Sequence, residues 1–118
     1  MRTPYHPTRA DLSLPAVLYA LSDPTRLAIV RMLAAAGERS CGGFGLPLPK
    51  PTLSHHFKVL REAGLIEIRL EGTQRRNSLR RADLDARFPG LLDAVLCAAQ
   101  ADAEPLPDAE SVLAVGGA

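Results

Sequence analysis

The sequence has few cysteines and no long apolar run, and each shortage excludes a class of protein. Two cysteines, Cys41 and Cys97, stand in 118 residues, which is too few for the disulfide framework of a small secreted domain. The longest apolar stretches, residues 15–21 and 90–99, are shorter than the roughly 20 residues that a membrane-spanning helix needs. The first residues lack the apolar stretch and cleavage site of an export signal. We therefore expect a cytoplasmic protein with free thiols and no membrane partner.

Charge is unevenly distributed along the chain, although the net charge is only +1. Residues 50–81 contain eight Lys and Arg side chains against three Asp and Glu side chains, whereas residues 82–118 contain one against seven. A basic segment beside an acidic one is typical of a protein that binds a polyanion through one surface. Chance clustering on a solvated surface is the alternative. A chain of this length forms one domain, so we expect one site.

The two ends of the chain differ from its middle. Residues 1–10 contain two prolines and no apolar periodicity, so we expect a flexible arm. Residues 103–118 consist mostly of Ala, Pro, Gly and acidic residues, which offer too little apolar surface to order the chain, so we expect a disordered tail. The predicted folded domain therefore spans residues 11–102.

Two helices are predicted at the beginning of this domain. Apolar residues recur at helical spacing over residues 12–21, which predicts the first helix. Asp23 can cap free backbone N–H groups, and Pro24 fits the first helical position without losing a hydrogen bond. A second helix is therefore predicted from there to about Ala36, with Gly37 ending it.

A third helix is predicted after a segment rich in glycine and proline, residues 40–51, which should form a stiff turn. Pro51 again fits a first helical position, and Leu53, Phe57 and Leu60 lie at helical spacing. The helix is therefore predicted to span residues 51–63. The face opposite these apolar side chains is predicted to be polar and basic, with Ser54, His55, Lys58 and Arg61.

The sequence pattern changes after the third helix. Apolar and charged residues alternate over residues 65–70, as in a half-buried strand, and Gly72 marks a tight turn before a return segment, residues 73–80. Apolar residues at helical spacing over residues 88–99 indicate a final helix. The predicted fold class is mainly α with a small β-hairpin.

Two motifs in the predicted domain resemble those of the ArsR/SmtB family of winged helix-turn-helix transcriptional repressors. They are Leu-Ser-Asp-Pro-Thr-Arg-Leu at residues 21–27 and Pro-Thr-Leu-Ser-His-His-Phe-Lys-Val-Leu-Arg-Glu-Ala-Gly-Leu-Ile at residues 51–66. The resemblance covers about residues 12–100. It implies a winged helix-turn-helix fold and a homodimer built from the first and last helices. It also implies a double-stranded DNA operator as partner and repression relieved by an inducer of unknown identity.

By this resemblance, the third helix is the recognition helix. Such a helix lies in the major groove and presents short polar side chains to base edges, while nearby cations neutralise phosphates. Two arginines near the hairpin tip would reach the flanking minor groove or its phosphates. The predicted DNA-binding residues are Lys50, Thr52, Ser54, His55, Lys58, Arg75 and Arg76. The alternative for each is an ordinary solvated side chain, and His56 is expected to pack in the interior beside Phe57.

Cys41 is the predicted sensor residue. Metal-sensing family members carry a Cys-x-Cys pair in this neighbourhood or zinc ligands on the last helix, but Cys41 is alone and residues 83–102 contain no histidine. We therefore predict no metal site. Arg39 close by in the sequence favours a reactive thiolate, so a thiol-reactive or redox signal is a candidate inducer besides a small molecule. The alternative is that Cys41 is a small buried residue.

Other functions fit the sequence less well. His55 and His56 point about 100° apart on a helix, and no carboxylate is placed to orient either, so we predict no enzyme and no cofactor. A winged-helix module that binds protein instead of DNA is one alternative, because fold alone does not fix function. The clustered basic charge argues against it. A metal-responsive repressor with a non-standard site is the other alternative.

Overall fold

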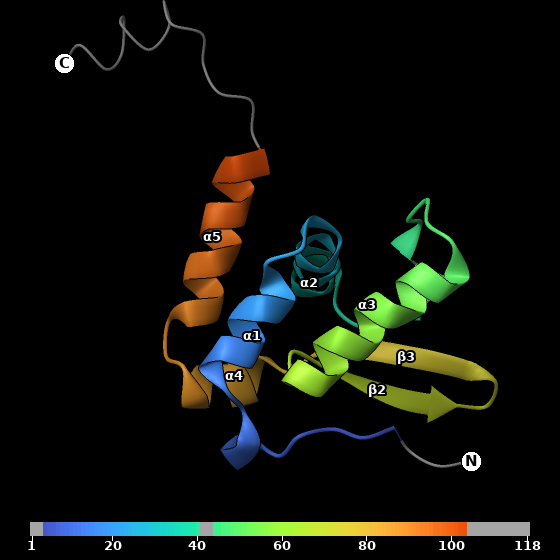
Figure 1. The fold of residues 1–118 in the computed structure, drawn as a ribbon, viewed down its shortest axis with the longest axis horizontal. Helices are drawn as coiled ribbons and strands as arrows, with labels where there is room; N and C mark the ends of the chain where they lie inside the picture. Colours follow the sequence, from blue (N-terminus) through green and yellow to red (C-terminus); the bar gives the residue numbers. More distant parts are fainter. Residues whose placement is uncertain (1–3, 41–43, 104–118) are drawn as a thin grey trace, which may run out of the picture.

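The computed structural model describes residues 4–40 and 44–103, which form a small helical domain with a projecting β-hairpin (Figure 1). The helices are α1 (Leu14–Leu21), α2 (Pro24–Ala36), α3 (Lys50–Ala63), α4 (Arg81–Arg87) and α5 (Leu91–Ala103), preceded by a short 3-10 turn, η1 (Arg9–Asp11). The strands are β1 (Arg39–Ser40), β2 (Ile66–Glu71) and β3 (Gln74–Leu79). The predicted fold class, mainly α with a small β-hairpin, is confirmed.

The first two helices begin at capping side chains. The Asp23 carboxylate accepts a hydrogen bond from the Arg26 backbone N–H (3.0 Å), and α2 starts at Pro24 as predicted. It ends at Gly37, whose φ of 78° lies in the left-handed region that favours glycine. Helix α1 begins later than the periodicity indicates, because Ser13 caps it and the residues before it form the separate 3-10 turn.

The sheet has the strand order β1-β3-β2, with both pairings antiparallel. The hairpin closes at the pair Glu71–Gln74 around a two-residue turn, in which Gly72 has a φ of 60°. Glycine adopts this conformation without steric cost, so the predicted turn position is correct. Strand β1 is two residues long and pairs Arg39 with Asn77. The sequence did not indicate it, because two residues are too few to show a period.

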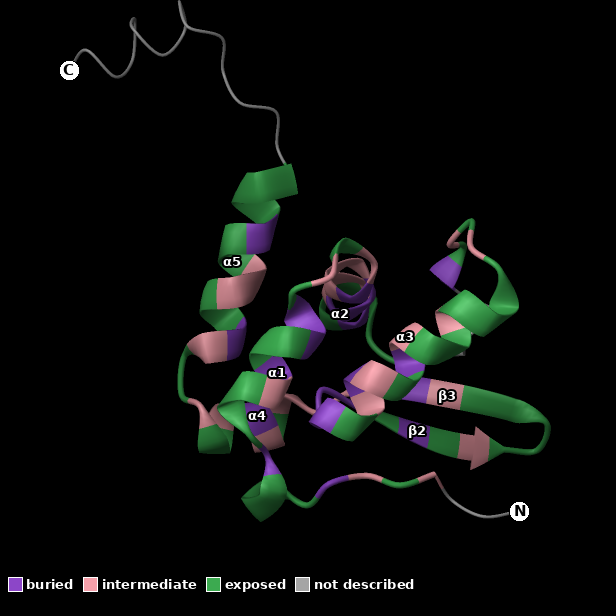
Figure 2. Cartoon of the chain, viewed as in Figure 1, coloured by how far each residue is buried: buried purple, intermediate pink, exposed green. Residues whose placement is uncertain are grey.

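The core lies between the helices and the near half of the hairpin, which is the half next to the helices and away from the turn at Gly72. Helix α3 is held to it by Phe57, Leu60 and Ala63, and the rings of Phe57 and Phe44 lie 5.2 Å apart. Figure 2 shows the near half of the hairpin buried and its far half exposed. The largest fully buried side chains are Ile29, Leu60, Leu65, Ile66, Val17, Val30 and Asn77. The hairpin tip and one side of α3 are therefore left to solvent.

The last predicted helix begins later than expected, and a separate helix precedes it. The sequence indicates a helix over residues 88–99, which corresponds to α5 from Leu91, whereas α4 ends at Arg87 before a break at Pro89 and Gly90, where Gly90 has a φ of 81°. Helix α4 buries only one side chain, Leu84. A single apolar anchor produces no periodicity, which is why the pattern missed this helix.

The N-terminal segment lies along β2 instead of extending loosely (Figure 1). The His6 Nε2 atom accepts a hydrogen bond from the Ile68 backbone N–H (3.0 Å), and the Pro7 carbonyl accepts one from Arg80 Nη1 (2.8 Å). Strand β2 is an edge of the sheet, so His6 satisfies a backbone donor that no strand pairs. Residues 4–10 of the expected flexible arm thus form tertiary contacts, which local sequence does not reveal. The predicted tail from residue 104 onward lies outside the described residues.

Candidate nucleic-acid interface

Helix α3 separates its anchoring side from a solvent-exposed polar side. It starts at Lys50, one residue earlier than predicted, and Gly64 ends it with a φ of 88°. Five of the predicted DNA-binding residues are exposed on α3, and we call them the α3 stripe: Lys50, Thr52, Ser54, His55 and Lys58. Because Phe57 and Leu60 fix the opposite side in the core, these side chains have to face outward. The amphipathic interpretation of this helix is therefore correct.

Arg61 departs from that interpretation. We expect it on the polar face, yet its side chain is only 12% exposed and its Nη2 atom lies 3.9 Å from Glu62. It extends the anchoring side of α3 at the helix end. Pro49, the residue before α3, provides no side-chain cap. The backbone N–H groups in the first turn of a helix lack intrahelical acceptors, so this uncapped end remains favourable for an anion.

The structure separates the two arginines of the hairpin. Arg75 lies opposite Leu70 in the register, and Arg76 lies opposite Arg69, so their side chains leave opposite faces of the sheet. Arg76 Nε lies 2.9 Å from Glu71 and 3.8 Å from Glu38. Arg75 is exposed and shares the face whose near half is buried against the helices. Arg76 already has carboxylate partners, whereas Arg75 points to solvent.

Most cations of the basic segment, residues 50–81, have a carboxylate partner, as Arg76 does, and only a few have none among the described residues. The Arg69 Nη2 atom lies 2.6 Å from Glu38, Arg80 Nε lies 2.9 Å from Asp83, and Arg81 Nη1 lies 2.8 Å from Asp93. Within residues 4–40 and 44–103, the exposed cations of the basic segment without an ion pair are Lys50, Lys58 and Arg75. All three are predicted DNA contacts, and they lie on α3 and at the hairpin.

A buried arginine behind α3 was missed by the sequence analysis. Arg26 on α2 is 6% exposed, and its guanidinium donates to the Ala20 carbonyl (2.7 Å) and the Tyr19 carbonyl (3.2 Å). Its Nη1 atom lies 3.3 Å from His56 Nδ1 on α3. The His56 side chain is 12% exposed, in agreement with the interior position expected for it. Arg26 therefore connects the junction of α1 and α2 to α3.

Asp23 completes this cluster. Burial raises the pKa of its carboxyl, but the Arg26 backbone N–H, His56 and the Arg26 charge together hold that pKa below its usual range. The Asp23 Oδ2 atom lies 3.8 Å from His56 Nδ1. One sequence signal could have revealed Arg26: it precedes Ile29, Val30 and Leu33 at the spacing of a single helix face. A charged residue on a core face needs buried partners.

The remaining sequence predictions concern the two cysteines, a metal site and a membrane-spanning helix. Cys41 lies outside them, and Cys97 is exposed on α5. Within residues 4–40 and 44–103 there is no group of three or more His, Cys, Asp or Glu side chains that could hold a metal ion. No helix in the same part of the chain is long and apolar enough to cross a membrane.

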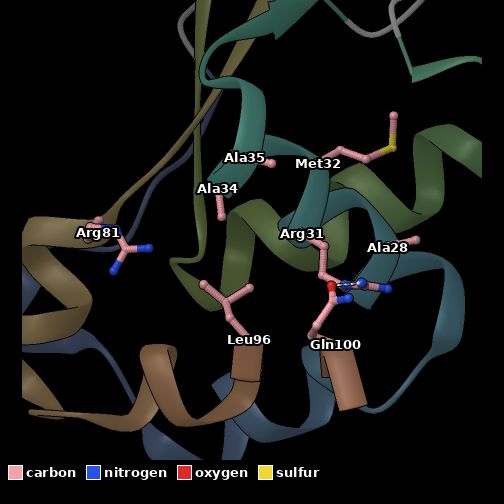
Figure 3. Close-up of a pocket in the computed structure, with 8 residues that line it drawn as sticks. All are labelled: Ala28, Arg31, Met32, Ala34, Ala35, Arg81, Leu96 and Gln100. Atoms are coloured by element: carbon pink, nitrogen blue, oxygen red, sulfur yellow. Dashed lines mark hydrogen bonds between the residues drawn. The ribbon is translucent and has the colours of Figure 1, made fainter. Parts of the chain in front are cut away.

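An open groove of about 530 Å³ lies between α2 and α5 (Figure 3). Arg31 Nη2 donates to Gln100 Oε1 at one end (2.9 Å), and Arg81 lies at the other end (Figure 3). The apolar side chains that line the groove are Ala28, Met32, Ala34, Ala35 and Leu96. The groove is thus apolar along its length and has a guanidinium at each end.

Comparison with known proteins places this geometry in a family. A family model described as a helix-turn-helix domain matches residues 21–69. The chain is 44% identical over 80 residues to the HTH-type transcriptional regulator YceK of Bacillus subtilis, an alignment that covers 65% of this chain and 80% of that protein. The region that the family model matches includes α2, α3 and the beginning of the hairpin.

Solved structures agree with this assignment. The transcriptional repressor BigR from Xylella fastidiosa superposes with a TM-score of 0.52 at 33% identity, over 64% of this chain and 85% of that one. An ArsR-like transcriptional regulator from Rhodococcus sp. RHA1 superposes with a TM-score of 0.53 at 29% identity, over 79% of this chain and 94% of that one. The prediction that the chain is a regulator and not an enzyme is confirmed by these relatives. The chain belongs to the ArsR family of DNA-binding helix-turn-helix transcriptional regulators.

Proposed function

We propose that this chain is a transcriptional repressor that binds a two-fold symmetric DNA operator as a homodimer. The observation that carries the proposal is the α3 stripe, a row of polar and basic side chains that is exposed while the opposite side of α3 lies in the core. A helix of this kind fits the major groove of B-form DNA. Ser54 and His55 would contact base edges, and Lys50 and Lys58 would contact the phosphates on either side.

The hairpin would extend the same contact surface. Arg75 is exposed beyond the buried half of the hairpin and has no ion pair among the described residues, so it can reach the minor groove or its phosphates. Arg76 is less suited to this role, because its partnership with Glu71 (2.9 Å) has to be broken first. Of the two predicted wing contacts, we therefore assign the main one to Arg75.

The proposed dimer would use α1 and α5. Leu14, Leu18 and Tyr19 of α1 are 41%, 46% and 63% exposed, which is unusual for large apolar side chains on one short helix. Helix α5 buries only Leu92 and Ala99 within the subunit. A second copy packed on α1 and α5 would cover both surfaces, and two α3 helices would then face half-sites about one helical turn apart.

Selection of bound sequences from random duplex DNA tests the proposal. A two-fold symmetric motif with half-sites about 10 base pairs apart is the expected result. Ser54→Ala and His55→Ala should each weaken binding to that motif by about 1–3 kcal/mol, since each removes a base contact. Failure to enrich any sequence, with binding that does not depend on salt, would instead favour a protein-interaction module.

We further infer that the signal that releases the repressor is a small molecule, a thiol-reactive compound or an oxidant, and not a metal ion. The groove between α2 and α5 supports a small molecule, because its lining is apolar along its length. A thiol signal would act at Cys41, with the exposed Cys97 as the second candidate thiol.

Fluorescence anisotropy of the operator complex separates these signals. Peroxide is added to the wild type, to Cys41→Ser and to Cys97→Ser, and zinc is added in a separate titration. Release that is lost only in Cys41→Ser assigns the sensor to Cys41. Full release by peroxide in Cys41→Ser rules that residue out, and release by zinc alone would restore the metal-responsive alternative.

A further inference from the structure

Arg26 is a charged side chain in the interior, and its partners account for its position. Burying a guanidinium without acceptors is unfavourable by several kcal/mol, so a buried arginine is found where acceptors surround it. Here the acceptors are two backbone carbonyls at the end of α1, those of Tyr19 and Ala20, and the His56 Nδ1 atom on α3. The guanidinium also lies over the Tyr19 ring, 5.2 Å from its centroid. One planar group thus spans three helices.

The chemistry of arginine fixes the direction of this contact. A guanidinium has donors and no acceptor, so Arg26 Nη1 donates and His56 Nδ1 accepts. The Asp23 carboxylate lies 3.8 Å from the same ring nitrogen, and the centroid of the His55 ring lies 6.0 Å from that of His56.

We propose that Arg26 is a positioning residue for operator recognition, which fixes the rotation of α3 about its own axis through His56. This inference rests on the proposed DNA-binding function. His56 directly follows His55 of the α3 stripe, so the contact with Arg26 fixes α3 in its middle. A helix with side chains has a radius of about 5–6 Å, so a rotation of about 20° moves the stripe by about 2 Å. A displacement of that size breaks a hydrogen bond to a base edge.

Positioning of α3 by Arg26 and general stabilisation of the fold predict different effects on DNA binding. Arg26 does not touch the exposed stripe, so its loss should leave the phosphate-driven affinity for any sequence largely intact. The affinity for the preferred sequence should fall, because base contacts require the stripe at a defined rotation. The ratio of the two affinities therefore measures positioning.

The experiment compares Arg26→Met, His56→Phe and His56→Gln with the wild type. The probes are the duplex enriched by selection and the same duplex with both half-sites scrambled. We expect Arg26→Met and His56→Phe each to lower the ratio of affinities about 10-fold, with the scrambled duplex bound within about 2-fold of wild type. His56→Gln should retain most of the ratio, because its side-chain carbonyl can accept from Arg26. Thermal melting checks that each variant is folded at the assay temperature.

A matched control and a double variant complete the test. Arg87→Met removes a guanidinium on α4 that also donates to a backbone carbonyl, at Leu12 (2.9 Å), and should leave the ratio unchanged. Arg26→Met combined with His56→Phe should reduce the ratio about 10-fold, as each single variant does, because both remove the same contact. Should Arg26→Met prove unfolded, the comparison of His56→Phe with His56→Gln carries the test.

Rescue by His56→Gln gives a readout that a purely structural role would not change. Glutamine keeps an acceptor for Arg26 and phenylalanine has none, so His56→Phe should lose the ratio and His56→Gln should retain most of it. A folded Arg26→Met with the full ratio, additive losses in the double variant, or equal losses in His56→Gln and His56→Phe would overturn the inference. Failure of the wild type to discriminate between the duplexes would instead refute the proposed function.

Discussion

At the scale of single residues, neighbours in the sequence have different environments. Arg75 is exposed, whereas Arg76 pairs with Glu71, because successive residues of a strand point to opposite faces. His55 is exposed, whereas His56 contacts Arg26, because successive residues of a helix are rotated by about 100°. The residue type indicates which chemistry is possible, and the orientation selects which of two identical neighbours can perform it.

The pair Arg75 and Arg76 provides a matched comparison. Arg75→Ala should weaken binding to all duplexes similarly and reduce the slope of log affinity against log salt by about one unit for each phosphate that is no longer neutralised. Arg76→Ala should change that slope less, because its guanidinium is held by Glu71. Binding titrations at several salt concentrations measure both slopes. Equal reductions in the two variants would show that the Glu71 pairing does not survive on DNA.

His6 should make stability depend on pH. Burial lowers the pKa of its imidazole below the ordinary 6.5, and the nearby Arg61 and Arg80 charges act in the same direction. The unfolded chain therefore binds a proton at His6 more readily than the folded chain does. The free energy of unfolding should be highest above pH 6.5 and should decrease as the pH falls below it.

Denaturant unfolding at pH 7.5 and pH 5.0 measures this effect. His6→Gln cannot titrate at this position, so its stability should change less between the two pH values than that of the wild type. All other residues are identical in the two proteins, so the difference between their pH dependences belongs to position 6. An identical pH dependence in the two proteins would mean that the contact between His6 and the Ile68 N–H does not contribute to stability.

At the scale of elements, α3 depends on its anchoring side for both its formation and its orientation. Leu60 is fully buried at the centre of that side, so Leu60→Ala should lower the free energy of unfolding by about 2–5 kcal/mol through reduced burial and a residual cavity. Glu62 is exposed on the same helix, and Glu62→Ala should change stability by no more than about 0.5 kcal/mol. Denaturant titrations of the two variants provide the measurement. A decrease below about 1 kcal/mol for Leu60→Ala would place the core elsewhere.

The helices and strands also show which elements a periodic sequence pattern can predict and which it cannot. The limits of α2 were predicted correctly, because a cap, a proline and a terminal glycine mark both ends. The start of α3 was predicted within one residue, because Pro51 marks the first turn of that helix. Helix α4 and strand β1 were missed, since seven residues with one buried side chain and a strand of two residues leave no period to detect.

At the scale of the whole molecule, the proposed DNA-binding and dimerisation surfaces are at different ends. Helix α3 and the hairpin lie together, and α5 lies on the far side of α1 from them (Figure 1). This arrangement suits a dimer that joins through α1 and α5 and leaves both recognition helices free.

A charged substitution on α1 tests the proposed dimer. Leu18→Glu should convert the protein to a monomer, because it places a carboxylate in the surface that a second copy would cover. Operator affinity should fall with it, since one α3 helix then reaches only one half-site. Tyr5→Glu introduces the same charge at another exposed apolar position, outside α1, and should leave the oligomeric state unchanged. Sedimentation velocity distinguishes the two, and a dimeric Leu18→Glu protein would contradict the α1 interface.

The amino-acid sequence by itself determined the helices α2 and α3, the hairpin and the polar side of the recognition helix, because these depend on local signals: caps, turn residues and spacing along one element. Tertiary structure decided which cations remain available, that His6 covers the edge of β2, and that Arg26 contacts α3. The contacts of His6 and Arg26 join residues 62 and 30 positions apart in the chain. Only folding brings such residues together, so no local pattern encodes their contacts.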